Sequence, residues 1–481
     1  MSKTVLLTGP TGYVGARLAP RLIEKGYKLK CLVRNPAEIE TRSWSKSAEI
    51  IKGDVYCGLN LKNALEGTDI AYYLVHSMAD TRDFEKYEEV SAFNFASAAA
   101  EAGVKKIIYL GGLAKKDEEL SRHLKSRIKT GEILRSHFLN VIELRAGIIV
   151  GSGSVSFEMI RYLSERLPFV PHFRYLKKSK CQPIAIRDVL SYLLLSAEKE
   201  NLSDKIIEIG GPDCLKYYEM LDIYAKVRGL KRFHLPCPSP SPKLCGTMIS
   251  IFTPIPYNIS VSLLESLKND SVKSNDDALK IFSEVKPLDY ETAVKYALQR
   301  ISEDRVESSW TANYAPSYHK PCSFIDAQGI ILQDYNAQVN AENEKVYRVF
   351  SGIGGENGYY FANWVWKLKA FQDKLIGGIG MRNGRRSLSE IHQGETLDFW
   401  RVERIIPSRM ILLRAEMKLP GKGWLQFQAN KISGNKTLLR ITAYFEPKGV
   451  FGYLYWYLLY PIHTFIFKGL IKEIKKRSEN L

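Results

Sequence analysis

A glycine-rich turn close to the N-terminus constrains the fold of this chain more than any other feature. The apolar run 4–8 reads as a short strand, and Gly9, Gly12 and Gly15 follow it at a spacing of three residues. The first glycine permits a tight turn, and the second lets backbone amides approach a pyrophosphate. The third lets the amphipathic segment 16–24 pack as a helix against the strand.

This arrangement predicts a dinucleotide-binding site at the turn. The N-terminus of the helix carries a partial positive charge, which favours the phosphates of a nucleotide. Thr11, Tyr13 and Val14 lie within the turn and are expected to line the same phosphate site. The alternative is a strand-to-helix turn without a ligand, but the flanking strand and helix are the context that the nucleotide motif requires.

The residue that ends the second predicted strand indicates which dinucleotide binds. Residues 27–33 read as a strand, and Arg34 follows it. An acidic residue at this point takes the 2′-hydroxyl of NAD, whereas an arginine accommodates the 2′-phosphate of NADP. Arg34, assisted by Arg17, therefore predicts NADP(H), with NAD(H) or a merely solvated arginine as the alternatives. Asp54 and Val55 follow the third predicted strand and are expected beside the adenine, whose amino group can donate to Asp54.

A fourth predicted strand carries candidates for proton transfer. The strand is predicted over residues 69–78, and its end carries Val75, His76 and Ser77. Ligands of such folds bind at the carboxyl edge of the sheet. Val75 is therefore expected against the cofactor, and His76 and Ser77 near its reactive ring. The alternative for His76 is a structural role at the end of the strand. Strands that alternate with helices predict a doubly wound parallel sheet, the α/β Rossmann type.

Several motifs together resemble the short-chain dehydrogenase/reductase superfamily, in its atypical, extended branch. The resemblance covers roughly residues 1–230 and lies in segments 8–15, 53–55, Asn94, 144–151, 183–189 and 207–212. It implies an NAD(P)-binding domain. In active members it also implies a serine after the fifth strand and a Tyr-x-x-x-Lys motif on the next helix. The lysine lowers the pKa of that tyrosine, which exchanges a proton with the substrate oxygen.

The present chain differs from the family at these catalytic positions. The fifth predicted strand ends in two glycines at 111–112, which offer no hydroxyl, and the helix positions hold His123 and Arg127. A histidine can act as a general acid near neutral pH, and Arg127 can hold a phosphate or a ribose. The alternative is that catalysis has been lost and both residues line the cofactor groove. A shift of one helical turn would bring Lys125 or Lys129 to the ribose instead.

From about residue 329 the pattern changes to that of an antiparallel sheet. Alternating apolar and polar residues predict strands at 396–403, 409–416, 424–429 and 436–445, followed by a long helix after Gly452. This order resembles the START-like helix-grip fold, an α+β fold whose sheet wraps a hydrophobic cavity. Residues 330–470 are also similar to a domain of unknown function that follows atypical short-chain dehydrogenase modules in bacterial proteins.

Three domains are therefore expected. They are an NAD(P)-binding Rossmann domain at 1–235, substrate-lobe helices with a proline-rich linker at 236–325, and a START-like domain at 326–481. Within the last, Arg385 and Arg386 lie near glycine pairs and are a candidate site for an anion or a headgroup. The alternative is that these glycines only set turns.

Composition and charge narrow the class of partners. The net charge of +17 and the isoelectric point of about 9.3 favour a phosphorylated cofactor or an anionic membrane surface. The sequence has no nucleic-acid-binding signature, which argues against nucleic acid. Seven scattered cysteines, never spaced as C-x-x-C, predict reduced thiols, no structural metal and a cytoplasmic location. The first apolar run is too short for a signal peptide.

The uncharged run 449–467 allows three interpretations. It is long enough to be read as a membrane span, but Pro461 and His463 interrupt it. A grip fold requires a helix that is apolar where the sheet covers it. Aromatic residues followed by lysines are also typical of a helix at a membrane interface. A core helix is expected first, with peripheral contact to the inner face of an anionic membrane as the next alternative.

Two functional hypotheses follow. The first is an NADPH-dependent oxidoreductase that acts on a small hydrophobic carbonyl, enone or quinone-like substrate, with a second domain that holds a hydrophobic ligand. In this hypothesis, His76, Ser77 or His123 transfers the proton. The second is a non-catalytic NADPH-binding module for assembly or redox sensing in respiratory or quinone metabolism. It rests on a resemblance of the first domain to a dinucleotide-binding accessory subunit of respiratory NADH dehydrogenase.

Overall fold

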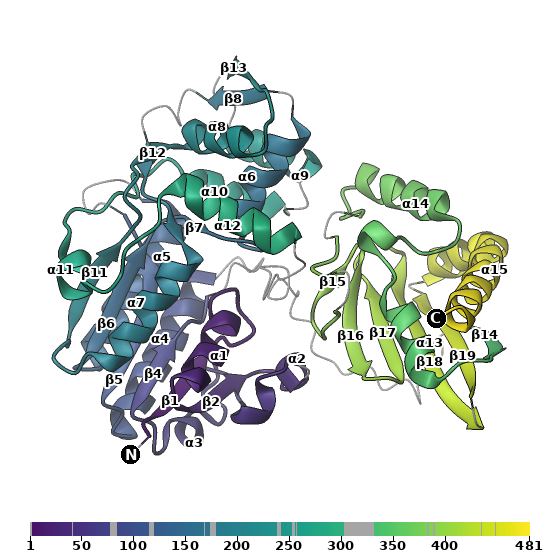
Figure 1. The fold of residues 1–481 in the computed structure, drawn as a ribbon, viewed down its shortest axis with the longest axis horizontal. Helices are drawn as coiled ribbons and strands as arrows, with labels where there is room; N and C mark the ends of the chain where they lie inside the picture. Colours follow the sequence, from purple (N-terminus) through teal and green to yellow (C-terminus); the bar gives the residue numbers. More distant parts are fainter. Residues whose placement is uncertain are drawn as a thin grey trace. The chain divides into compact units, whose positions relative to one another are not determined.

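The computed structural model divides the chain into two units, residues 1–316 and 317–481, which are described separately (Figure 1). The description covers residues 2–40, 42–76, 84–114, 120–167, 169–173, 179–237, 242–252, 255, 257–302, 331–381, 384–387, 390–433, 435–447 and 449–481.

The first unit is built on a parallel sheet. Its seven described strands lie in the order β11-β6-β5-β4-β1-β2-β3, and every neighbouring pair is parallel. The strands are β1 (Thr4–Thr8), β2 (Lys28–Val33), β3 (Ala48–Lys52), β4 (Ile70–Tyr73), β5 (Lys106–Gly112), β6 (Val141–Ala146) and β11 (Lys205–Ile209). The order changes direction at β1, next to β4, as in a doubly wound Rossmann sheet. The predicted α/β class is confirmed.

Helices cover both faces of this sheet (Figure 1). Val5 and Leu7 of β1 pack with α1 (Gly15–Glu24) and α7 (Ile186–Glu198). Leu6 between them packs with the opposite layer, because successive side chains of a strand point to opposite faces. That layer holds α3 (Leu61–Leu65), α4 (Phe84–Glu101) and α5 (Arg122–His137). Burial on both faces explains why the strands read as continuous apolar runs.

A smaller lobe of the first unit has its own core. Five helices share one apolar cluster: α6 (Val155–Arg166), α8 (Tyr217–Val227), α9 (Pro242–Phe252), α10 (Tyr257–Ser266) and α12 (Tyr290–Ser302). Strands β8 (Phe169–Phe173) and β13 (Phe233–Cys237) pair in parallel beside it. Helices from before and after residue 236 therefore pack together in this lobe.

Short elements complete the first unit. They are α2 (Ala37–Glu40), η1 (Ser45–Ser47), β7 (Ile149–Val150), β9 (Lys180–Cys181), β10 (Ile184–Ala185), β12 (Leu215–Lys216) and α11 (Asp277–Ile281).

The second unit holds an antiparallel sheet. Its six described strands lie in the order β14-β19-β18-β17-β16-β15. They are β14 (Ile331–Val339), β15 (Thr396–Leu397), β16 (Trp400–Ile406), β17 (Met410–Ala415), β18 (Gly421–Ser433) and β19 (Lys436–Pro447). The sequence pattern predicted an antiparallel sheet here, and this is confirmed. Strand β14 was not predicted; it pairs with β19 at one edge of the sheet.

Three helices and one short turn accompany this sheet: α13 (Asn343–Ser351), η4 (Gly355–Asn357), α14 (Asn363–Leu375) and the long α15 (Gly449–Glu479). Helix α15 continues through Pro461. It buries Trp456, Phe467 and Leu470 against the sheet, as expected for a core helix. Within the described residues, no helix combines the length and the apolar character that crossing a bilayer requires.

Candidate functional site

The glycine turn after β1 has the backbone that the sequence predicts. Gly9 adopts φ +68°, and a Cβ atom there would lie 2.6 Å from the carbonyl oxygen of Leu74. A Cβ atom on Gly15 would lie 2.1 Å from the carbonyl oxygen of Gly9. The amide of Gly12 donates to that same carbonyl at 3.0 Å. A side chain at Gly9 would therefore push the turn away from the adjoining end of β4, and one at Gly15 would collide with the backbone of the turn itself.

The helix that follows the turn is open to an anion. Val14 occupies the N-cap of α1 and makes no side-chain hydrogen bond to the helix, whose first turn contains no acidic residue. Its first amides are thus not satisfied by a capping side chain, and the helix dipole favours negative charge at this point. The turn and the helix N-terminus fit the pyrophosphate of a dinucleotide.

Arg17 has a structural role on α1. Its guanidinium lies 4.2 Å from the centre of the Tyr13 ring and donates to the carbonyl oxygen of Ser152 at 2.8 Å. Only 4% of Arg17 is exposed. The guanidinium ties the turn to the loop after β7, so the structure gives no support to the expected help from Arg17 in choosing NADP(H).

Arg34 stands in an aromatic and polar cluster after β2. Its exposed side chain hydrogen-bonds Tyr87 of α4. Burial, followed by the nearby Asp54 carboxylate, raises the pKa of Tyr87. The Tyr87 ring stacks on Tyr56 with centres 4.5 Å apart. The Asp54 carboxylate accepts the amide of Tyr56 at 2.8 Å. A cationic side chain and a stacked pair of rings thus meet where the resemblance places the adenosine.

Asn94 fixes the chain after β3. Its amide donates to the carbonyl oxygens of Val55 and Tyr56 at 3.2 and 2.7 Å. Val55 itself is buried against the α3 and α4 layer. The family motif at Asn94 therefore has a physical reason, because it holds the loop that carries Asp54 and Tyr56.

His76 forms an ion pair with Glu88 beyond the end of β4. Its Nδ1 lies 2.7 Å from Oε1 of Glu88, a residue of α4 that is 5% exposed. Ser126 of α5 donates to the other carboxylate oxygen. Burial opposes ionisation of Glu88, but the His76 charge, its hydrogen bond, Arg127 and Ser126 hold the pKa of Glu88 at about 2. Ser77, the third candidate for proton transfer, lies outside the described residues.

His123 lies beside His76 but has different chemistry. The two rings are 4.8 Å apart between centres. Burial, followed by repulsion from His76 and Arg127, lowers the pKa of His123 to about 3. The imidazole is therefore neutral at neutral pH, so a general-acid role of His123 stays a prediction that this low pKa does not support. Lys125 and Lys129, the alternatives on the same helix, are both exposed.

Arg127 is held by strand β5. Its Nη2 donates to the carbonyl oxygen of Leu110, and the guanidinium lies 5.2 Å from the centre of the Tyr109 ring. A Cβ atom on Gly112 would lie 3.4 Å from the Cβ atom of Arg127 and 3.2 Å from a methyl group of Leu124. Helix α5 thus packs closely over the strand end where the family carries its serine. Arg127 bonds the protein itself in this arrangement, and its contact with a phosphate or a ribose stays a prediction.

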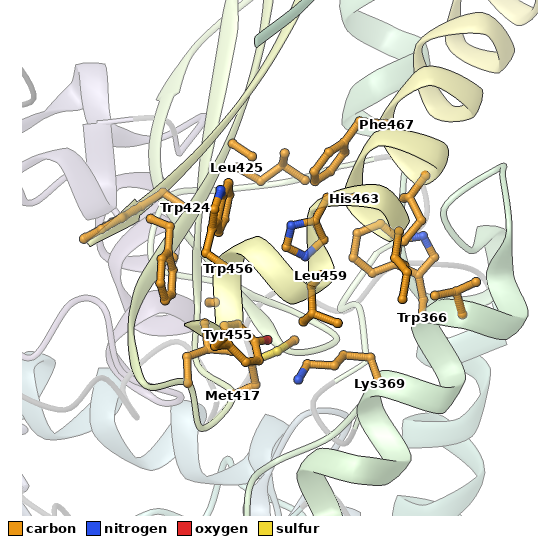
Figure 2. Close-up of a pocket in the computed structure, with 18 of the residues that line it drawn as sticks. Trp366, Lys369, Met417, Trp424, Leu425, Tyr455, Trp456, Leu459, His463 and Phe467 are labelled. Atoms are coloured by element: carbon orange, nitrogen blue, oxygen red, sulfur yellow. The ribbon is translucent and has the colours of Figure 1, made fainter. Parts of the chain in front are cut away.

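The second unit contains an apolar cavity of about 180 Å³ between α14, α15 and the sheet. Figure 2 shows Trp366 and Lys369 of α14 facing Trp456 and His463 of α15 around it. Its lining also includes Val365, Leu368, Gln372, Trp400, Ala415, Met417, Leu419, Gly423, Trp424, Leu425, Ala443, Tyr444, Phe445, Tyr455, Leu459, Ile462, Ile466 and Phe467. No acidic residue belongs to this described lining.

The cavity holds indole N–H donors together with amide, phenol and imidazole groups that can also accept. Among the described residues, Nε1 of Trp366 and of Trp456 find no hydrogen-bond partner, and neither does Nδ1 of His463. Burial, followed by the charge of Lys369, lowers the pKa of His463 to about 4. The cavity suits an apolar body with a hydrogen-bond acceptor.

The arginine pair of the second unit supports the fold. Arg385 donates to the carbonyl oxygens of Ser351 and Ile353, both at 2.7 Å. Arg386 donates to Oε1 of Glu395 at 2.6 Å. These bonds correct the expectation of an anion or headgroup site at Arg385 and Arg386.

The structure thus brings His76 and His123 together beside the glycine turn and gathers Arg34 and Asp54 at a second point. Sequence reasoning missed Glu88, Ser126, Tyr56 and Tyr87. The aromatic pair had a signal, since Tyr56 directly follows the family motif at 53–55. No sequence pattern marked Glu88, because the sequence does not show which turn of α4 faces His76.

Comparisons with known proteins match parts of both units. Residues 1–137 match the NmrA-like family, and residues 327–470 match a protein family of unknown function, DUF2867. A ceramide reductase of Caulobacter vibrioides is 22% identical over 262 residues, which cover 53% of this chain and 80% of that protein. Cinnamoyl-CoA reductase 1 of Arabidopsis thaliana is 30% identical over 113 residues, only 22% of this chain and 33% of the relative.

Solved structures show the same fold for the first unit. A triphenylmethane reductase of Citrobacter sp. has a TM-score of 0.51 at 19% identity, over 62% of this chain and 99% of that one. A nucleoside-diphosphate-sugar epimerase of Staphylococcus aureus has a TM-score of 0.51 at 15% identity, over 61% and 100%. The chain therefore joins an NmrA-like Rossmann domain of the NAD(P)-binding type to a C-terminal DUF2867 domain.

Proposed function

We propose that the first unit is an NAD(P)H-dependent oxidoreductase that acts on a small hydrophobic carbonyl, enone or quinone-like substrate. The ion pair of His76 and Glu88 carries this proposal. It holds a histidine in one orientation at the carboxyl edge of the sheet, where ligands of such folds bind. The glycine turn adjoins the same edge, because Gly9 packs against the carbonyl of Leu74.

His76 is the proposed proton-transfer group. Glu88 stays ionised at neutral pH, since its pKa is about 2, and it accepts the proton on Nδ1 of His76. This hydrogen bond fixes the ring orientation and leaves Nε2 to exchange a proton with the substrate oxygen. Ser126 holds the far side of the carboxylate. The nicotinamide, when bound, supplies the hydride.

NADP(H) is the proposed cofactor. Arg34 is exposed and stands beside the stacked rings of Tyr56 and Tyr87. A guanidinium in this position can pair with a phosphate through two parallel hydrogen bonds. NAD(H) lacks the phosphate and would gain nothing from Arg34.

The second unit is the proposed holder of a small hydrophobic ligand, in keeping with a START-like helix-grip fold. The support is the apolar cavity beneath α15. Cavities of this size bind benzene-sized molecules in other proteins. The relatives named as reductases of ceramide and of cinnamoyl-CoA also support an apolar substrate class.

Turnover by the purified full chain tests the enzymatic proposal. NADPH absorbance is followed with a panel of hydrophobic aldehydes, ketones, enones and quinones. His76→Gln is expected to lower turnover about 100-fold or more, the usual contribution of a proton-transfer group. His137→Gln, at the exposed end of α5, is the matched control and should leave the rate unchanged. Equal rates for both variants would remove His76 from the reaction.

Cofactor affinity tests the NADP(H) assignment separately. Arg34→Ala is expected to weaken NADPH binding about tenfold or more, the scale of a lost charge-assisted pair. NADH binding to the same variant should stay as it is. An unchanged NADPH affinity would show that Arg34 does not contact the 2′-phosphate.

A non-catalytic NADPH-binding module is the second candidate. The observations that favour it are the glycines at the strand end and the neutral His123, which replace the family's serine and tyrosine. Such a module would serve assembly or redox sensing in the respiratory or quinone machinery. It predicts tight NADPH binding with no turnover on any compound of the panel.

A further inference from the structure

Helix α14 exposes a stripe of large apolar side chains. Trp364, Leu368, Phe371 and Leu375 recur at spacings of four, three and four residues, which place them on one side of the helix. Each is between 49% and 71% exposed. The opposite side of the helix buries Trp366 and Ala370 in the core. Helix α14 is thus apolar on two sides, and only one of them is used by the fold.

Helix α15 has a matching stripe. Leu454, Leu458, Ile462 and Phe465 recur at spacings of four, four and three residues, and each is between 44% and 73% exposed. Its buried side chains, among them Trp456, face the sheet. A folded protein in water rarely leaves so many neighbouring apolar side chains uncovered.

The two stripes meet at the mouth of the cavity. Leu368 and Ile462 belong to the stripes and also line the cavity. The helices touch at this point, since the Lys369 ammonium lies 4.9 Å from the centre of the Tyr455 ring. Figure 2 shows both side chains at one end of the cavity. The two stripes are called the α14–α15 face below.

The charges around this face are positive. Lys367, Lys468 and Lys472 are exposed. The segment 449–472 contains no acidic residue. The segment 361–376 contains one, Asp373, which is 2% exposed and accepts backbone amides of Gly380 and Lys418, both at 2.8 Å. An apolar protein partner would not require this charge, whereas an anionic lipid surface attracts it.

We propose that the α14–α15 face docks the second unit on an anionic lipid membrane. Leucine and phenylalanine side chains would enter the acyl boundary, while Trp364, Tyr457 and Tyr460, all exposed, suit the headgroup level. The mouth of the cavity would then open toward the lipid phase, which is a source of the small apolar molecules that the cavity can hold.

Flotation of the full chain with lipid vesicles tests the docking. Vesicles of phosphatidylcholine alone are compared with vesicles that also contain phosphatidylglycerol, at low and high salt. Binding is expected only with phosphatidylglycerol and should weaken with salt. Leu458→Glu and Phe371→Glu should each lower the partition coefficient about tenfold or more. Lys468→Gln and Lys472→Gln should lower it about fivefold each.

Leu139→Glu is the matched control, because Leu139 is 95% exposed in the first unit. It should bind vesicles as the unsubstituted chain does. Loss of binding in Leu139→Glu, or full binding in Leu458→Glu, would overturn the proposal. So would an absence of binding to either vesicle. Sedimentation velocity tests whether a second copy of the chain occupies the face. A dimer that Leu458→Glu dissociates would assign the face to self-association instead of lipid.

Discussion

His76 and His463 are each held within their own unit, and their surroundings give them opposite chemistry. His76 is paired with a buried carboxylate at 2.7 Å, and a hydroxyl supports that carboxylate. His463 lies among aromatic rings, 5.0 Å from Trp456 and 5.9 Å from Phe467 between ring centres. The first environment orients the proposed proton-transfer group, whereas the second keeps an imidazole neutral inside an apolar wall.

The chemistry of each histidine depends on the charged group beside it as well as on its burial. In the first unit the Glu88 carboxylate lies 2.7 Å from Nδ1 of His76 and orients the ring. In the second unit, burial and then the Lys369 ammonium work against protonation of His463. Leucine in place of His76 and leucine in place of His463 should therefore change the free energy of unfolding by different amounts.

The largest difference is expected in stability at neutral pH. His76→Leu leaves the Glu88 carboxylate buried without its cation and should cost about 2–4 kcal/mol of the free energy of unfolding of the first unit. Urea-induced unfolding of the full chain measures this cost. His137→Leu, at an exposed position on α5, should stay within about 0.5 kcal/mol of the unsubstituted chain. A similar small value for His76→Leu would mean that the ion pair contributes little.

The two sites should also differ in the pH at which each unit loses stability on acidification. The folded-state pKa of Glu88, about 2, is below its ordinary value of 4.5. Its ionised form therefore stabilises the first unit above pH 4.5, and this stabilisation is lost as the pH falls toward 2. Glu88→Gln should remove the loss from urea titrations of the first unit across this window. An unchanged pH dependence would contradict the depressed pKa.

His463 should respond at a higher pH. Its folded-state pKa of about 4 lies below the ordinary value of 6.5, so the unfolded chain takes up the proton first. The stability of the second unit should thus be level above pH 6.5 and decline as the pH falls toward 4. His463→Leu should abolish this decline and change the stability at neutral pH by less than about 1 kcal/mol. A large loss of stability at neutral pH would show that the imidazole makes a polar interaction.

Much of the fold could be predicted because it follows from local patterns. The glycines of the first turn and the continuous apolar strands require only backbone sterics and burial on both faces of a sheet. The alternating strands of the second unit required only the two-residue period. Strand β14 was missed because its sequence mixes polar and apolar residues and it pairs with a strand that lies far along the chain.

The sites could be predicted only in part, because they depend on contacts between distant residues. His76 and Arg34 follow strand ends, where the topology alone places ligands. Glu88 becomes meaningful only when α4 turns it toward His76. Arg385 and Arg386 look like an anion site in the sequence, yet they bond backbone carbonyls and Glu395 in the structure. The cavity depends on two helices between which strands β15 to β19 lie in the sequence.

Transfer of label from NADPH tests the central claim, that the first unit is a working nicotinamide site, most directly. The full chain is incubated with NADPH that carries deuterium as its transferable hydrogen and with the hydrophobic carbonyl panel, and the products are examined by mass spectrometry. Deuterium is expected in a reduced product, with much less in His76→Gln and an unchanged amount in His137→Gln. Tight NADPH binding without label in any product would contradict the central claim and leave a nucleotide-binding module.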